Sequence, residues 1–120
     1  MNADILSGGV SWMRDPIACT DHLFWLHKYN GNQFIVVFRK FYERLLNIDR
    51  EDGYITDHRI SEESNYIFVM YPFISRQKEF GYSDVTASNG KQGYVEGLFN
   101  GTEEKLRILS KVRNFYQNLS

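Results

Sequence analysis

Two Asn-Gly pairs, Asn30-Gly31 and Asn89-Gly90, each lie between segments with the composition of β-strands. Asn and Gly both tolerate the positive φ angles that a type I′ turn requires, and the twist of this turn matches that of paired strands. Each pair therefore predicts the tip of a β-hairpin. The paired segments are residues 23–29 with 33–38, and residues 78–88 with 91–99.

The end of the chain carries a helical pattern instead. Thr102 is placed to cap a helix that runs to about residue 119, and the carboxylates of Glu103 and Glu104 would stabilise the positive end of its dipole. Apolar residues recur at helical spacing and predict one buried stripe, with Phe115 beside it. The stripe consists of Leu106, Leu109, Val112, Tyr116 and Leu119.

The middle of the chain is less uniform. Residues 66–71 are continuously apolar, as in a central strand, and Pro72 would end that strand because it lacks an amide hydrogen. Residues 54–60 predict a short strand. Residues 33–46 are ambiguous: β-branched residues favour a strand at 33–38, whereas aromatic and leucine residues at helical spacing favour a helix. We favour the hairpin, and residues 39–47 either prolong its strand or turn helical.

These elements predict a single α+β domain spanning residues 1–120, in which an antiparallel β-sheet with two Asn-Gly hairpins packs against a C-terminal amphipathic helix. A chain of this length buries enough apolar surface to form a core without metals or disulfides. Aromatic residues make up 16% of the chain, which suits a sheet-rich core. The alternative is an exposed Tyr and Trp patch that anchors a partner.

The net charge indicates the class of partner, and the cysteine content indicates the cellular compartment. The net charge is −1, so counterion release offers little drive for nucleic-acid binding, and we expect none. Cys19 is the single cysteine, which excludes an intrachain disulfide and fits a reducing compartment. The sequence contains neither an apolar run long enough to span a bilayer nor a secretory signal at its start. We expect a cytoplasmic protein, monomeric or dimeric, without a membrane partner.

No motif predicts catalysis, a metal or a cofactor. Cys19 and His22 have the spacing of two zinc ligands, but a structural zinc site needs about four. Residues 47–58 resemble a calcium loop only faintly, because the glycine is one place late and His58 replaces the final glutamate. The alternative with a chemical role is a two-histidine site, with His27 and His58 as acid and base of a phosphodiester hydrolase.

Carboxylates cluster between residues 49 and 63, and a tyrosine lies among them. They are either a solubilising face or an anionic patch that steers a basic partner. We take them as the candidate partner-binding residues, with the tyrosine as anchor. The set is Asp49, Glu51, Asp52, Tyr54, Asp57, Glu62 and Glu63.

The C-terminal segment KLRILSKVRNFYQNL, residues 105–119, is an apolar helix that ends in Phe-Tyr shortly before the last residue and follows a run of predicted strands. In these features the chain resembles small immunity proteins of bacterial contact-dependent growth inhibition systems. The resemblance implies a single soluble domain that neutralises a cognate toxin by tight binding, often by occluding its active site. We therefore expect a non-catalytic protein-binding module whose partner is a nuclease-type toxin with a basic active site. A small-ligand-binding or structural subunit is a further alternative.

Overall fold

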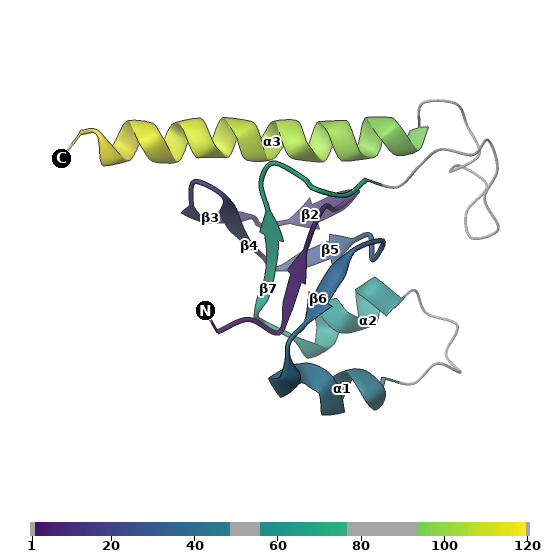
Figure 1. Ribbon diagram of the computed structural model, residues 1–120. Coiled ribbons are helices and arrows are strands. Elements are labelled where there is room, and N and C mark those ends of the chain that lie inside the picture. Colours follow the sequence, from purple (N-terminus) through teal and green to yellow (C-terminus); the bar gives the residue numbers. More distant parts are fainter. Residues whose placement is uncertain (1, 49–55, 77–93, 120) are drawn as a thin grey trace.

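The computed structural model describes residues 2–48, 56–76 and 94–119. Its centre is a five-stranded sheet with the order β3-β4-β7-β1-β6, and a separate two-stranded sheet pairs β2 with β5 (Figure 1). The larger sheet contains β1 (Ile5–Ser7), β3 (Ile17–Thr20), β4 (Leu23–Leu26), β6 (Ile35–Val37) and β7 (Ile67–Met70). The smaller sheet contains β2 (Trp12–Arg14) and β5 (Lys28–Asn30).

The α+β class is confirmed, but the sheet is mixed and not purely antiparallel. β7 pairs antiparallel with β4 on one side and parallel with β1 on the other. The parallel pair forms because helices lie between β1 and β7 in the chain, which gives the crossover length that parallel strands need. The central position expected for residues 66–71 is confirmed, and the strand ends at Met70, just before the cis Tyr71-Pro72 bond.

The first Asn-Gly pair is not a hairpin tip. Gly31 does adopt the expected positive φ, 115°, but the strands on either side of it pair elsewhere: β5 with β2, and β6 with β1. Hydrogen bonds from segments that are distant in the chain hold this connection between β5 and β6 in place. The backbone N–H of Gly31 donates to the Asp57 carboxylate at 2.6 Å, and that of Ser11 donates to the Asn30 carbonyl at 2.9 Å. The second pair, Asn89-Gly90, lies outside the described residues.

Among the described residues between β6 and β7, three segments are helical. A 3₁₀ turn, η1 (Arg39–Phe41), leads into α1 (Tyr42–Leu46), so the helical alternative holds for this region. α2 (Thr56–Glu63) replaces the strand expected at 54–60, which was wrong for residues 56–60. Asp57 lies in the first turn of α2, where its negative charge is favourable at the positive end of the helix dipole.

The C-terminal helix, α3 (Tyr94–Gln117), begins earlier than expected. Thr102 is not its cap but lies in its interior, where its hydroxyl is within hydrogen-bonding distance of the carbonyls of Leu98 and Ser11. The strand expected at 91–99 was therefore wrong for residues 94–99. Helical spacing explains the extension, because the buried residues of α3 recur every three or four positions. These are Val95, Phe99, Thr102 and Leu106.

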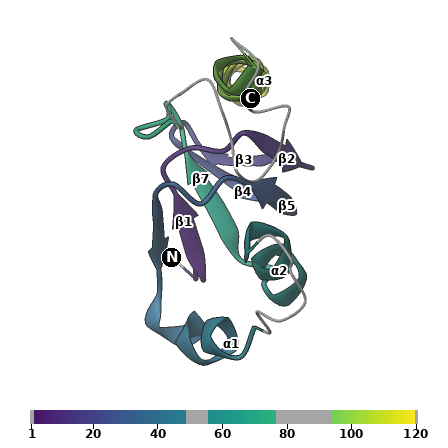
Figure 2. The same cartoon turned by 90° about the vertical axis from the view of Figure 1, so that its right-hand side faces the viewer.

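The core lies between the inner face of the five-stranded sheet, the two-stranded sheet and the helices. Alternate residues of the central strands point into it, for example Phe24 and Leu26 of β4 and Ile67 and Val69 of β7. Tyr29 of β5 and Ile60 of α2 complete it from the other side. α3 crosses one end of the sheet, whereas α1 and α2 lie toward the other end (Figures 1 and 2).

Candidate functional site

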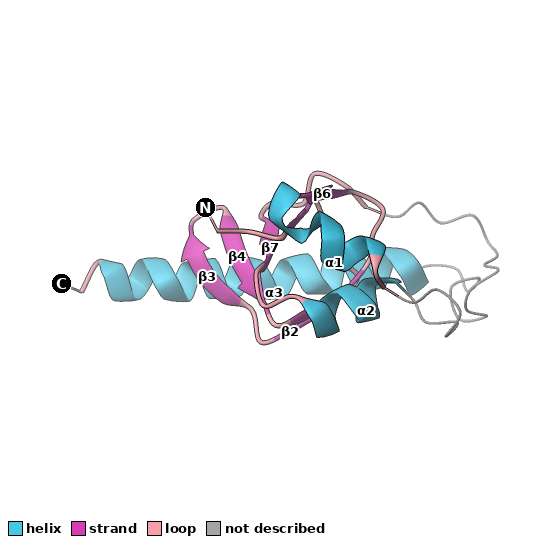
Figure 3. Cartoon of the chain, turned by 90° about the horizontal axis from the view of Figure 1, so that it is seen from below, coloured by secondary structure: helices cyan, strands magenta, loops and turns pink. Residues whose placement is uncertain are grey.

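The C-terminal half of α3 exposes large apolar side chains. Buried contacts hold the first half, where Leu106 is fully buried and Phe99 packs edge-to-face on Phe73. The last turns project beyond β3, as the views from the front and from below both show (Figures 1 and 3). The exposed fractions are 49% for Ile108, 45% for Val112, 61% for Phe115, 66% for Tyr116 and 66% for Leu119.

These side chains do not continue the buried stripe. At about 100° of rotation per residue, positions 108, 112 and 115 fall within an arc of about 60°, centred about 140° away from the buried face, and Leu119 follows two residues after the helix ends. Alternating steps of four, three and four residues are those of a heptad seam. The expected single stripe is therefore wrong beyond Leu109: Val112 lies on the opposite side of the helix, and Tyr116 and Leu119 are exposed. Phe115 and Tyr116 form an edge-to-face pair with ring centroids 5.5 Å apart.

The charged side chains along this segment are all basic. Residues 105–119 contain two lysines and two arginines and no carboxylate. The arginines are engaged within the protein: Arg107 with Glu104 at 2.7 Å, and Arg113 with Asp21 at 2.9 Å. The Arg107 hydrogen bond lowers the pKa of the Glu104 carboxyl group. Lys105 and Lys111 form no ion pair with described residues and flank the apolar row on its two sides.

We define the outward face of α3 as Lys105, Ile108, Lys111, Val112, Phe115 and Tyr116, together with Leu119, which lies two residues beyond the end of the helix. Its shape and chemistry are those of an amphipathic helix that enters an apolar groove, with anchors at positions i, i+4, i+7 and i+11. The buried stripe expected from the sequence includes Val112 and Leu119, has Phe115 beside it and leaves Ile108 out. A sequence pattern does not distinguish an apolar row that packs on the sheet from one that faces away.

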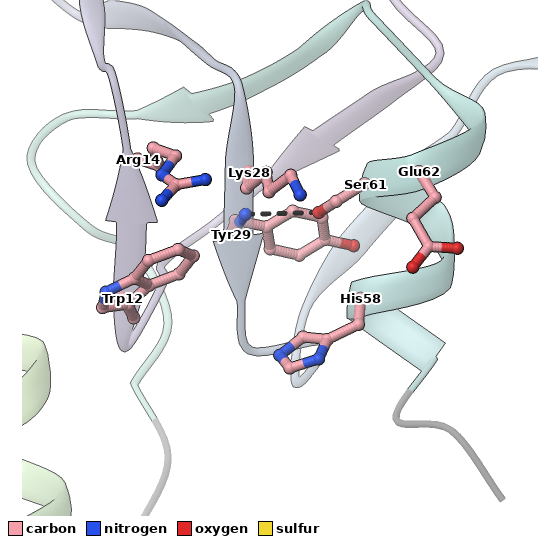
Figure 4. A pocket seen from close by; sticks show the side chains of 7 residues that line it. All are labelled: Trp12, Arg14, Lys28, Tyr29, His58, Ser61 and Glu62. Atoms are coloured by element: carbon pink, nitrogen blue, oxygen red, sulfur yellow. Dashed lines mark hydrogen bonds between the residues drawn. The ribbon is translucent and has the colours of Figure 1, made fainter.

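A pocket of about 240 Å³ lies between the two-stranded sheet and α2 (Figure 4). Trp12 and Arg14 reach it from β2, Lys28 and Tyr29 from β5, and three residues of α2 complete the wall. The Tyr29 backbone N–H donates to the Ser61 hydroxyl at 3.3 Å and ties β5 to α2. The remaining lining residues are His58 and Glu62. Sequence reasoning missed Arg14, because it lies in the chain's irregular beginning and carries no motif.

Three of the predicted partner-binding residues, Asp57, Glu62 and Glu63, lie in the described part of the chain, all on α2. Asp57 is only 5% exposed and uses both carboxylate oxygens on backbone N–H groups, so it is structural. Glu62 and Glu63 are exposed, and Glu62 forms an ion pair with Arg59 at 3.1 Å. The other members, Asp49, Glu51, Asp52 and Tyr54, lie outside the described residues.

The two histidines of the alternative catalytic site occupy separate surroundings. The His27 ring stacks on Trp25 and lies 3.2 Å from the Asp15 carboxylate. His58 lines the pocket, and His27 is not among its lining residues. The His22 ring nitrogen Nδ1 lies 3.1 Å from the Tyr71 carbonyl, and no group of three potential metal ligands occurs among residues 2–48, 56–76 and 94–119.

A second apolar row crosses the outer face of the five-stranded sheet. Strand register places one residue from each strand side by side: Ile17, Trp25, Phe68, Leu6 and Val36. The three inner members are half-buried, and the Trp25 indole donates to the Asn65 carbonyl at 2.7 Å. This row is flatter and less exposed than the outward face of α3, so α3 is the stronger candidate for a contact surface.

None of the helices in the described ranges has both the length and the apolar character that a bilayer crossing requires. Comparison of the chain with protein-family models, with curated proteins and with solved structures found no match.

Proposed function

We propose that this protein is a non-catalytic protein-binding module and that the outward face of α3 is its contact surface. One observation carries the proposal: large apolar side chains at heptad spacing are exposed on the side of α3 that faces away from the core. Contiguous apolar surface of this kind marks interaction sites in soluble proteins. Aromatic anchors such as Phe115 and Tyr116 contribute disproportionately to binding energy.

The basic residues on the outward face of α3 indicate what kind of partner groove this helix fits. Lys105 and Lys111 flank the apolar row and form no ion pair with a described carboxylate. A groove with apolar walls and acidic residues on its rim complements this pattern. A second copy of the chain complements it less well, because pairing two such helices brings lysines of both copies to the same seam.

Within this class we propose an immunity or inhibitor protein that neutralises a cognate nuclease-type bacterial toxin in the cytoplasm by occluding its active site. The support is the resemblance carried by residues 105–119, which is the segment that presents the exposed row. Of the predicted partner-binding carboxylates, those exposed in the described ranges are Glu62 and Glu63 of α2. α2 and α3 lie toward opposite ends of the sheet, so a toxin that contacts both has to span the molecule (Figure 1).

The test is growth rescue. The reading frame that neighbours this protein's gene and has the size of a toxin is expressed in a bacterial host with and without this protein. We expect the wild-type chain to restore growth and Phe115→Asp to abolish rescue, because a charge at the centre of the apolar row opposes burial. The matched control is Asn114→Asp, which adds the same charge about 100° away around the helix and leaves rescue intact.

Two results would count against the proposal. Equal rescue by Phe115→Asp and wild type would remove α3 from the interface. Loss of rescue with Asn114→Asp as well as Phe115→Asp would show that a change of charge anywhere on the helix suffices. Circular dichroism of both variants establishes that each is folded.

A further inference from the structure

A second site, independent of α3, lies in the pocket between β2, β5 and α2. We propose that this pocket binds a small anion, namely an aromatic ring that bears one phosphate or carboxylate group. The juxtaposition that carries the proposal is Arg14 and Lys28 side by side at the pocket, with the Trp12 indole next to them (Figure 4).

Strand register places the two cations directly opposite each other. Arg14 and Lys28 are paired residues of the antiparallel β2–β5 ladder, and like charges in this position destabilise a sheet. No described carboxylate lies within ion-pair distance of either cation. The single carboxylate that lines the pocket, Glu62, is paired with Arg59. Within the described part of the chain, no ion pair therefore offsets the repulsion between the two cations, whereas a bound anion would.

The other lining groups define the rest of the ligand. Trp12 precedes Arg14 by two residues, so both side chains project from the same face of β2. Its indole is 42% exposed and offers a flat face on which a ring can stack. The His58 imidazole reaches the pocket from α2 and can donate a further hydrogen bond to an anion.

The size of the pocket restricts the ligand. A volume of about 240 Å³ falls below the range of most drug-sized ligand sites. It accommodates one ring with one anionic group. Arg14 can bind a phosphate or a carboxylate through two parallel N–H donors, and Lys28 adds a point charge beside it.

The experiment is a titration of the full chain that is monitored by ¹H–¹⁵N correlation spectra. The probes are phenyl phosphate, benzoate, inorganic phosphate and benzyl alcohol. We expect phenyl phosphate or benzoate to shift the amides of residues 12–14, 28–30 and 58–62 together with the Trp12 indole N–H, which Trp12→Phe identifies. Whichever of the two binds more tightly identifies the anionic group. Inorganic phosphate is expected to bind more weakly because it lacks the ring, and benzyl alcohol because it lacks the charge.

Variants separate binding from folding. Arg14→Gln and Lys28→Gln should each weaken binding about tenfold or more, the loss of a charge-assisted hydrogen bond. Neither should lower the melting temperature, because each removes one of two repelling charges. Lys105→Gln is the control: it removes an equal charge from α3 and should leave binding unchanged.

The proposal fails if neither aromatic anion shifts the pocket amides, if benzyl alcohol or inorganic phosphate binds as tightly as they do, or if Arg14→Gln binds like wild type. Equal weakening by Lys105→Gln would also overturn it, since the effect would then come from overall charge. Growth rescue through α3 is a separate readout, so failure here and failure of the proposed function are distinguishable.

Discussion

At the scale of single residues, two fully buried polar side chains organise the fold. Asp4 is paired with Lys40 at 2.6 Å and with Arg44 at 3.4 Å, and it accepts the Ser64 hydroxyl at 2.5 Å. This carboxylate ties the residues before β1 to η1, α1 and the end of α2. Tyr29 is the other: its hydroxyl donates to the Asn32 side chain at 2.6 Å.

Tyr29 gives the stability of the protein a specific dependence on alkaline pH. Burial, and secondarily the negative charge of Asp57, raise the pKa of the Tyr29 hydroxyl above its ordinary value of about 10. The neutral form is therefore favoured in the folded state, and its contribution to stability is fully present below about pH 10. Above that pH the tyrosine ionises in the unfolded chain first, so stability falls by up to about 1.4 kcal/mol per pH unit.

Urea unfolding between neutral and strongly alkaline pH tests this, with Tyr29→Phe as the comparison. At neutral pH the variant should lose about 1 kcal/mol with the hydrogen bond to Asn32. Above about pH 10 the difference should shrink and then reverse, because phenylalanine does not ionise. Parallel pH profiles for wild type and variant would contradict a raised pKa at this position.

At the scale of elements, the sequence predicted the fold class better than it predicted which strands pair with each other. The closing helix and the central strand at 66–71 were predicted because their apolar patterns are local. The partners of β5 and β6 were not, since they depend on contacts with Ser11 and Asp57, which are distant in the chain. The candidate site also combines a local pattern, which the sequence shows, with a long-range arrangement, which it does not. The apolar residues of α3 were recognised, but the side that each occupies depends on where the sheet lies.

The two faces of α3 should respond differently to truncation. Leu106→Ala removes a fully buried side chain and should cost about 2–5 kcal/mol of the free energy of unfolding. Ile108→Ala, two residues away and 49% exposed, should change it by about 0.5 kcal/mol or less. Chemical denaturation of the two variants measures both values. Similar losses at the two positions would show that Ile108 is packed, and the outward face would then be misassigned.

At the scale of the whole molecule, the described residues separate three chemical surfaces. The outward face of α3 is apolar with lysine flanks, the pocket beside α2 is cationic with an indole, and the outer sheet face carries a flat apolar row. Contacts from Phe99 on Phe73 to Arg113 on Asp21 hold α3 to the body of the protein, and its last residues project beyond β3 (Figure 1). The exposed row is therefore presented on a fixed helix, which limits the ordering cost of binding.

The most direct test of the account is site-specific photo-crosslinking at position 115 in cells of the source organism, with position 114 as the matched control. We predict one covalent adduct, formed with a different protein from position 115 and absent from position 114. The purified partner should bind the wild-type chain and the Asn114→Asp variant but not Phe115→Asp. The account is contradicted if position 115 yields no adduct, if both positions crosslink equally, or if the only adduct is a second copy of this chain.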